Sequence, residues 1–148
     1  MKEFKGVEHR LEYVRTINET DYINDSKATN IDSVIVAINT YKQPIVLILG
    51  GFNKGANFRL LLPHIKSSHV RDIVSYGDAG GQINTALGDA VRSVQVTDLS
   101  SAVKKAQLMA APGDIVLLSP GCASYDEFSN FEERGNHFKS IIKNLAAS

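Results

Sequence analysis

Apolar residues follow two alternating patterns along this chain. Residues 45–49 form an uninterrupted apolar run that ends in two glycines, which is typical of a parallel strand buried on both faces. Before it, isoleucine and valine recur at helical spacing, at positions 31, 34, 35 and 38. The whole pattern predicts strands at 11–17, from 22 onward, and at 45–49, 70–76, 91–96 and 114–118, and helices from 29 onward and at 58–65, 80–87, 99–109 and 131–145.

Alternation of this kind is typical of an α/β protein. We expect a Rossmann-like, three-layer α/β/α fold with a mostly parallel sheet of about six strands. A short polar turn separates the first two strands, so they should pair antiparallel, with 11–17 at the sheet edge. We expect Thr29 to cap the first helix, with Asp32 in a capping box, and Pro63 to limit the helix at 58–65.

The composition of the chain gives no support for several classes of function. The 148 residues fit one domain, and the 16 basic and 16 acidic residues balance, which gives no support for binding nucleic acid or a membrane surface. The start at 1–7 is short and polar, so we expect no signal peptide. Cys122 is the single cysteine, which excludes an internal disulfide. These features favour a cytoplasmic protein.

Three polar segments follow predicted strands and precede predicted helices, at 24–30, 50–55 and 119–126. The carboxyl ends of parallel strands meet at one edge of a sheet, where ligands bind in α/β proteins. In the first segment, Asp25 is a candidate for a ribose hydroxyl or a metal-bound water, and Lys27 for a phosphate. The alternative makes Asp25 and Thr29 simple helix caps.

The second and third segments offer different chemistry. Lys54 follows a glycine turn and is suited to pairing with a carboxylate, or else is a solvated surface lysine. The segment is not a P-loop, which needs Gly-x4-Gly-Lys-Ser/Thr. Cys122 has no histidine at a catalytic spacing, so we expect a small buried residue rather than a nucleophile. The glycines at 77–81 lack the dinucleotide pattern and predict a turn.

Five motifs in order carry a family resemblance. They are His9-Arg-Leu-Glu12, Asn24-Asp-Ser-Lys-Ala-Thr-Asn30, Leu49-Gly-Gly-Phe-Asn-Lys54, Ser119-Pro-Gly-Cys-Ala-Ser-Tyr-Asp126 and Asn130-Phe-Glu-Glu-Arg-Gly135. Together they resemble the C-terminal domain of the Mur ligases, and within that family the members that add D-glutamate to UDP-N-acetylmuramoyl-L-alanine. The resemblance spans nearly the whole chain, from His9 to about Phe138.

The resemblance implies a two-step reaction. ATP phosphorylates the carboxylate of UDP-N-acetylmuramoyl-L-alanine, and D-glutamate then attacks the acyl phosphate. It implies that Arg10, Asp25 and Lys27 approach ATP. It also implies that Thr29, Lys54, Ser124 and Phe131 hold D-glutamate, assisted by the backbone around Tyr125. ATP and Mg²⁺ are the implied cofactors of the full-length enzyme, and no metal ligand is implied on this chain.

The resemblance also sets expectations about organisation. Residues 1–148 should be the C-terminal domain alone, without the N-terminal UDP-sugar domain and the central ATPase domain, and should not catalyse by themselves. Family members often carry an acidic residue just before the lysine, where this chain has Phe52 and Asn53. Two alternatives stay open: a stand-alone Rossmann-like regulatory module that binds a nucleotide or amino acid, and a Mur ligase that adds a diamino acid.

Overall fold

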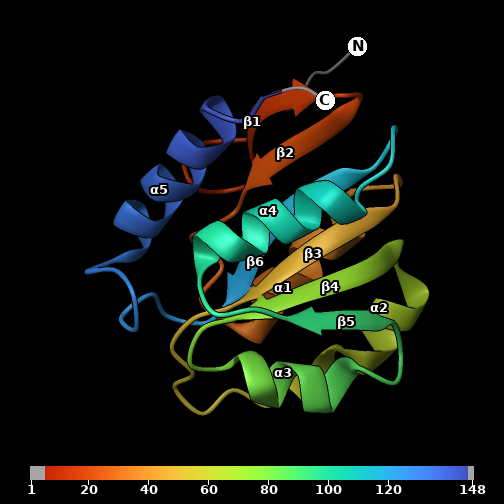
Figure 1. Cartoon of the computed structure of the whole chain (residues 1–148). Coiled ribbons are helices and arrows are strands. Elements are labelled where there is room, and N and C mark those ends of the chain that lie inside the picture. The colour runs from red at the N-terminus through yellow and green to blue at the C-terminus, as the bar shows by residue number, and fades with distance from the viewer. Residues whose placement is uncertain (1–5, 147–148) are drawn as a thin grey trace.

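The sheet of the computed structural model, which describes residues 6–146, has six strands in the order β1-β2-β6-β3-β4-β5 (Figure 1). β1 pairs antiparallel with β2, and every other pair is parallel. The predicted fold and its antiparallel edge strand are therefore confirmed. The bounds are β1 Glu12–Ile17, β2 Thr20–Asn24, β3 Ile45–Gly50, β4 Val70–Tyr76, β5 Arg92–Gln95 and β6 Ile115–Gly121.

Helices cover both faces of the sheet and complete three layers (Figure 1). One face is covered by α1 (Ile31–Thr40), the short 3-10 helix η1 (Phe58–Leu61), α2 (Leu62–Ser67) and α3 (Gly80–Leu87). The other carries α4 (Leu99–Met109) and α5 (Phe131–Lys143). β3 explains the arrangement, because Ile45, Leu47 and Leu49 pack on one helical layer while Val46 and Ile48 pack on the other.

Two local predictions about helix ends are wrong. The N-cap of α1 is Asn30, whose extended backbone lets its side chain accept a hydrogen bond from the Ser33 N–H at 2.9 Å. Thr29 and Asp32 therefore form no capping box. Pro63 lies in the first turn of α2, where its missing N–H has no intrahelical partner to lose, so it begins a helix rather than limiting one.

The carboxyl ends of β2, β6 and β3 lie side by side. Asn24 pairs with Leu118, and Gly50 pairs with Gly121. The three polar segments therefore leave the sheet together, as predicted. Beyond the strands, Phe52 and Ala123 exchange two backbone hydrogen bonds of 2.8 and 3.1 Å, which joins the second segment to the third.

Gly51 is needed at this junction. Its φ is +120°, and a Cβ there would lie 2.5 Å from the carbonyl oxygen of Ala123. Any side chain would therefore push the two segments apart, so the glycine is required by close approach of two backbones.

The amino ends of the strands carry an ion-pair network. Asp72 is buried and accepts two hydrogen bonds from Arg92, at 2.9 and 3.0 Å, and one from Arg71 at 3.1 Å. Arg71 also contacts Asp114 at 2.8 Å. These hydrogen bonds outweigh burial and hold the pKa of Asp72 below its ordinary value. Each buried carboxylate here thus has a guanidinium partner.

Two further sequence expectations concern what the chain does not do. Among residues 6–146, no helix is both long and apolar enough to cross a membrane. Most of the polar start, from which we expected no signal peptide, lies outside the described residues. Cys122 is buried, and burial raises the pKa of its thiol to about 12, which suits the predicted structural role rather than nucleophilic catalysis.

Candidate functional site

A cavity of about 420 Å³ opens where β2 ends and α1 begins. Arg10, Asp25 and Lys27, the three residues implied to approach ATP, all line it. Thr29 and Phe131 line it too. The cavity therefore gathers two cations, the carboxylates of Asp25 and Asp32, and an aromatic ring beside the N-terminus of a helix. The cations and the helix N-terminus are the groups suited to an anion.

Asp25 is the buried acid of this cavity. Its Oδ1 accepts a hydrogen bond from the Leu11 N–H at 3.1 Å, and its Oδ2 accepts one from the Ser119 hydroxyl at 2.8 Å. Burial raises the pKa of Asp25 to about 6, although these bonds and the positive charge of Arg10 act in the opposite direction. The side chain is thus fixed in place, and it changes charge close to neutral pH.

Arg10 is presented by a tight turn in the N-terminal segment. Val7 and Arg10 exchange two backbone hydrogen bonds of 3.2 and 2.9 Å across the turn. His9 and Leu11, on either side of Arg10, have positive φ angles of 65° and 48°. Residues other than glycine rarely adopt this conformation, so other contacts must hold the turn.

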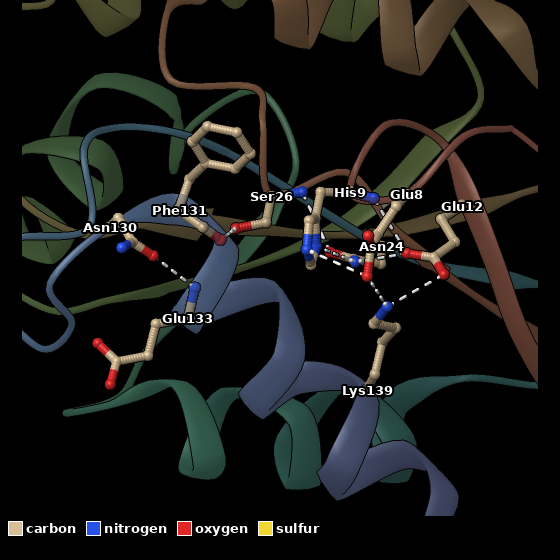
Figure 2. A network of polar contacts seen from close by, with 9 residues as sticks. All are labelled: Glu8, His9, Glu12, Asn24, Ser26, Asn130, Phe131, Glu133 and Lys139. Carbon is tan, nitrogen blue, oxygen red and sulfur yellow. Dashed lines mark hydrogen bonds and ion pairs between the residues drawn. The ribbon is translucent and has the colours of Figure 1, made fainter.

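A partly buried polar network supplies those contacts (Figure 2). Asn24 donates through its Nδ2 to Nδ1 of His9 and to Oε1 of Glu12, both at 3.0 Å. Lys139 of α5 donates to Glu8 at 3.1 Å and to Glu12 at 3.2 Å. Burial raises the pKa of Glu12, but the hydrogen bonds from His9, Asn24 and Lys139 outweigh it and leave the pKa lowered. The turn is therefore fastened to both β2 and α5.

Gly135 lets α5 approach this network. A Cβ at Gly135 would lie 2.1 Å from Nδ1 of His9 and 3.1 Å from Nδ2 of Asn24. The histidine ring thus occupies the space that a side chain would need. This accounts physically for the glycine that ends the last of the five sequence motifs.

A groove of about 510 Å³ adjoins the cavity, and Thr29, Asn30 and Asp32 line both. Thr29 and Lys54 both line the groove, together with residues 121–123 of the third segment. Lys54 is exposed, and its Nζ lies 5.6 Å from the centre of the Tyr125 ring, a cation–π distance. Thr29 therefore lines both the groove that contains Lys54 and the cavity that contains Arg10 and Lys27.

The remaining residues implied for D-glutamate lie elsewhere. Ser124 is buried and lines neither hollow, and its carbonyl accepts hydrogen bonds from the N–H groups of Glu127 and Phe128. Phe131 lines the first cavity rather than the groove, and its carbonyl accepts a hydrogen bond from the Ser26 hydroxyl at 2.7 Å (Figure 2). The five residues implied for D-glutamate are thus not gathered in one hollow.

The loop before Lys54 is shaped by an amide rather than an acid. Asn53 accepts hydrogen bonds from the N–H groups of Gly55 and Ala56, at 3.0 and 2.7 Å. This local turn sets the backbone at Lys54. The Tyr125 ring stands beside the ammonium group.

Arg134 was not singled out by sequence reasoning. It is fully buried, and its guanidinium donates to the hydroxyl and carbonyl of Ser26, at 2.9 and 2.7 Å, and to the carbonyl of Cys122 at 2.9 Å. The signal in the sequence was its place in the Asn130–Gly135 motif. An arginine is seldom buried unless its donors have partners, so a buried arginine indicates a polar network.

Comparison with known proteins identifies the family to which the chain is similar. Residues 9–122 match the family model described as "Mur ligase, glutamate ligase domain". Relatives named UDP-N-acetylmuramoylalanine–D-glutamate ligase are 45% identical over 142 residues in Chloroherpeton thalassium and 46% identical over 144 residues in Clostridioides difficile. Each alignment covers 96% of this chain but only 30% and 32% of the relative. The chain therefore spans about a third of the length of these relatives.

A solved structure shows the same fold. The bifunctional folylpolyglutamate synthase/dihydrofolate synthase from Yersinia pestis, complexed with AMPPNP and a manganese ion, has a TM-score of 0.65 over 93% of this chain and 32% of its own. Its sequence is 16% identical, so the likeness concerns the fold alone. The family match, the relatives and the ordered motifs agree, and the chain belongs to the Mur ligase family as its C-terminal, glutamate ligase domain.

Proposed function

We propose that this chain is the domain that binds D-glutamate and part of ATP in the ligase that adds D-glutamate to UDP-N-acetylmuramoyl-L-alanine. One observation carries the proposal: relatives with that name align over nearly the whole chain at about 45% identity. The layout of the site supports it, because the cavity lined by Arg10 and Lys27 and the groove lined by Lys54 adjoin at Thr29. A phosphate donor and an amino acid would then meet at one edge of the sheet.

The cavity is assigned to ATP. Arg10 and Lys27 are both exposed cations, suited to phosphate oxygens, and the N–H groups at the start of α1 favour negative charge beside them. Asp25, when ionised, accepts a hydrogen bond from a ribose hydroxyl. ATP, when bound, supplies the phosphoryl group that activates the carboxylate. The part of this chain is to bind and orient the nucleotide.

The groove is assigned to D-glutamate. Lys54 pairs with one carboxylate of the substrate, and the Thr29 hydroxyl, which lines the same groove, donates a second hydrogen bond. The Ser124 side chain is buried, so we infer that this segment contributes through backbone groups near Tyr125 or after a local shift. With Lys54 fixed, the amine of D-glutamate is left free to act as the nucleophile.

A divalent metal is expected with the nucleotide, but not as a group held by side chains of this chain. A fold relative binds manganese with a nucleotide, and Mg²⁺ is the metal that usually accompanies ATP. Within residues 6–146, no group of three or more histidine, cysteine or acidic side chains is placed to hold a metal ion. We therefore assign the metal to the nucleotide phosphates and give it no ligand from this chain.

The domain should be incomplete by itself. Its described loops offer positioning groups, and phosphoryl transfer also needs a phosphate-cradling loop and metal ligands, which we assign to the rest of the ligase. We expect no ATP hydrolysis and no amide formation by the 148-residue chain. Phosphate release above that of a matched preparation carrying Lys54→Ala, Lys27→Ala and Arg10→Ala would contradict this assignment.

The test of substrate class is a titration of the ¹⁵N-labelled chain with D-glutamate, L-glutamate and meso-diaminopimelate. We expect shifts at Thr29 and Lys54 with D-glutamate only, and a Kd in the millimolar range, about −4 kcal/mol or weaker, because the loops lack a partner domain. A preference for meso-diaminopimelate would favour a ligase for diamino acids. Micromolar affinity for one ligand would favour a stand-alone regulatory module.

A further inference from the structure

The guanidinium of Arg134 is a buried charge that forms hydrogen bonds to neutral groups. The side chain is fully inaccessible to solvent, and no ion pair among the described residues includes it. Carbonyl oxygens and one hydroxyl receive its hydrogen bonds instead. Burying a charge in this way is costly unless its donors are well satisfied, so a position that keeps an arginine needs a reason beyond packing.

All three polar segments converge on this one side chain. Nε and Nη2 bind Ser26 in the first segment, and Nη1 binds the carbonyl of Cys122 in the third. The second segment passes so close that a Cβ at Gly51 would lie 3.2 Å from Nη1. Arg134 thus bonds the first segment to the third, and the second segment, which the Phe52–Ala123 hydrogen bonds join to the third, passes beside it.

The contact also closes a ring with α5. The Ser26 hydroxyl accepts from Nε of Arg134 and donates to the carbonyl of Phe131, three residues earlier on the same helix. The first turn of α5 and the loop at 24–30 are therefore bound to each other in both directions. Phe131 lines the cavity, so its position depends on the same ring of bonds.

The residues that contact Arg134 are close in sequence to the candidate ligand-binding residues. Ser26 lies between Asp25 and Lys27, on the loop assigned to ATP. Cys122 and Gly51 lie two and three residues before Ser124 and Lys54, on the loops assigned to D-glutamate. A planar guanidinium donates hydrogen bonds in several fixed directions at once. An ammonium group cannot reproduce this geometry.

We propose that Arg134 is a positioning residue that fixes the nucleotide loop and the two glutamate loops relative to one another. We call the hydrogen bonds of Arg134 to Ser26 and Cys122 the clamp. The identity of the ligands rests on the proposed function, whereas the clamp itself does not. Loss of the clamp should weaken both ligands together. Loss of Lys54, by contrast, should weaken D-glutamate alone.

The experiment compares four variants of the ¹⁵N-labelled chain with wild type. Arg134→Lys keeps the charge but not the fork of donors, and Ser26→Ala removes one acceptor while leaving Arg134 in place. Phe138→Leu is the structural control, because Phe138 is a fully buried residue on the same helix whose contacts are with the apolar core. Lys54→Ala is the control for a single ligand. Amide exchange and titrations with Mg·AMPPNP and D-glutamate are measured for each.

We expect Arg134→Lys to lower exchange protection at the amides of Phe52, Gly121 and Ala123 by roughly 10-fold or more, relative to those of Ile48 and Leu117. Ser26→Ala should do the same to a smaller extent. Both should weaken AMPPNP and D-glutamate by similar factors. Phe138→Leu should lower protection across the α4–α5 layer without this local excess.

Two results would overturn the proposal. One is a loss of protection in Arg134→Lys and Ser26→Ala that is spread through the core as in Phe138→Leu. The other is unchanged affinity for both ligands in variants whose loops are shown to be loosened. If wild type responds to neither ligand, the proposed function fails, and the exchange comparison alone decides the role of Arg134.

Discussion

The two ends of the sheet treat buried charge in opposite ways. At the amino ends of the strands, Asp72 and Asp114 are buried, and each faces a guanidinium that reaches solvent. At the carboxyl ends, Asp25 is buried against neutral donors, and Arg134 against neutral acceptors. The buried acids of the amino end thus have charged partners, whereas within residues 6–146 Asp25 and Arg134 form hydrogen bonds only to neutral groups, although Lys139 pairs with Glu12 nearby.

The difference indicates which end stabilises the fold and which serves a ligand. The paired end holds the pKa of its acid down, so ionisation favours the folded state. At the other end burial raises the pKa of Asp25 to about 6, so ionisation disfavours the folded state. Sites that carry such a cost are typical of functional positions, where stability is exchanged for a prearranged charge.

The largest expected effect is at Gly135. Gly135→Ala should lower the free energy of unfolding by about 2–4 kcal/mol, because the new Cβ would displace the His9 ring and break its bond to Asn24. Denaturant unfolding measures the change. The matched control is Gly81→Ala, a helical site whose Cβ would meet nothing closer than 3.8 Å, and it should stabilise by up to ~1 kcal/mol. Equal effects from the two alanines would show that the His9 contact is dispensable.

Lys54 tests the ligand end directly. In the full-length ligase, Lys54→Ala should lower kcat/KM for D-glutamate by ~10- to 150-fold, which corresponds to the ~1.5–3 kcal/mol of a charge-assisted hydrogen bond. The KM for ATP should change little. Lys66→Ala, an exposed lysine on α2, is the control and should change neither. A parallel loss for both substrates would assign Lys54 a different role.

Asp25 should show the cost of an unpaired buried acid. Asp25→Asn should stabilise the chain by about 1–3 kcal/mol at neutral pH, since it removes an ionisation that burial disfavours, while it weakens nucleotide binding. The gain should shrink as the pH falls from above the folded pKa of about 6 toward the ordinary value of 3.8, because the wild-type acid is then protonated in the folded state. Unfolding curves across that range check the sign.

Asp72 should show the reverse at the paired end. Asp72→Asn should destabilise by about 1–2 kcal/mol at neutral pH, because the carboxylate is buried while its arginine partners are partly hydrated. The loss should persist down to the ordinary pKa of 3.8 and disappear as the pH falls through the lower folded value. If both asparagine variants gave the same pH dependence, the contrast between the two ends would be wrong.

The sequence predicted the sheet well because its strands are dominated by local apolar runs. It also placed three loops at one edge, since their position follows from strand direction alone. Helix caps failed where two adjacent residues, Thr29 and Asn30, are both good caps and only backbone geometry chooses between them. The convergence on Arg134 joins residues 108 apart in sequence, and no local pattern encodes it.

The strand order has a consequence for how the chain folds. β2 lies between β1 and β6, so the second strand to be synthesised pairs with the last, Asp21 with Ile115. Closing so long a loop is slow compared with joining neighbouring βα units. We therefore expect β3, β4 and β5 to assemble first and the β1–β2 hairpin to dock only after β6 is in place. In pulse-labelled exchange during refolding, the amide of Asp25, which donates to Leu118 of β6, should become protected later than that of Leu47.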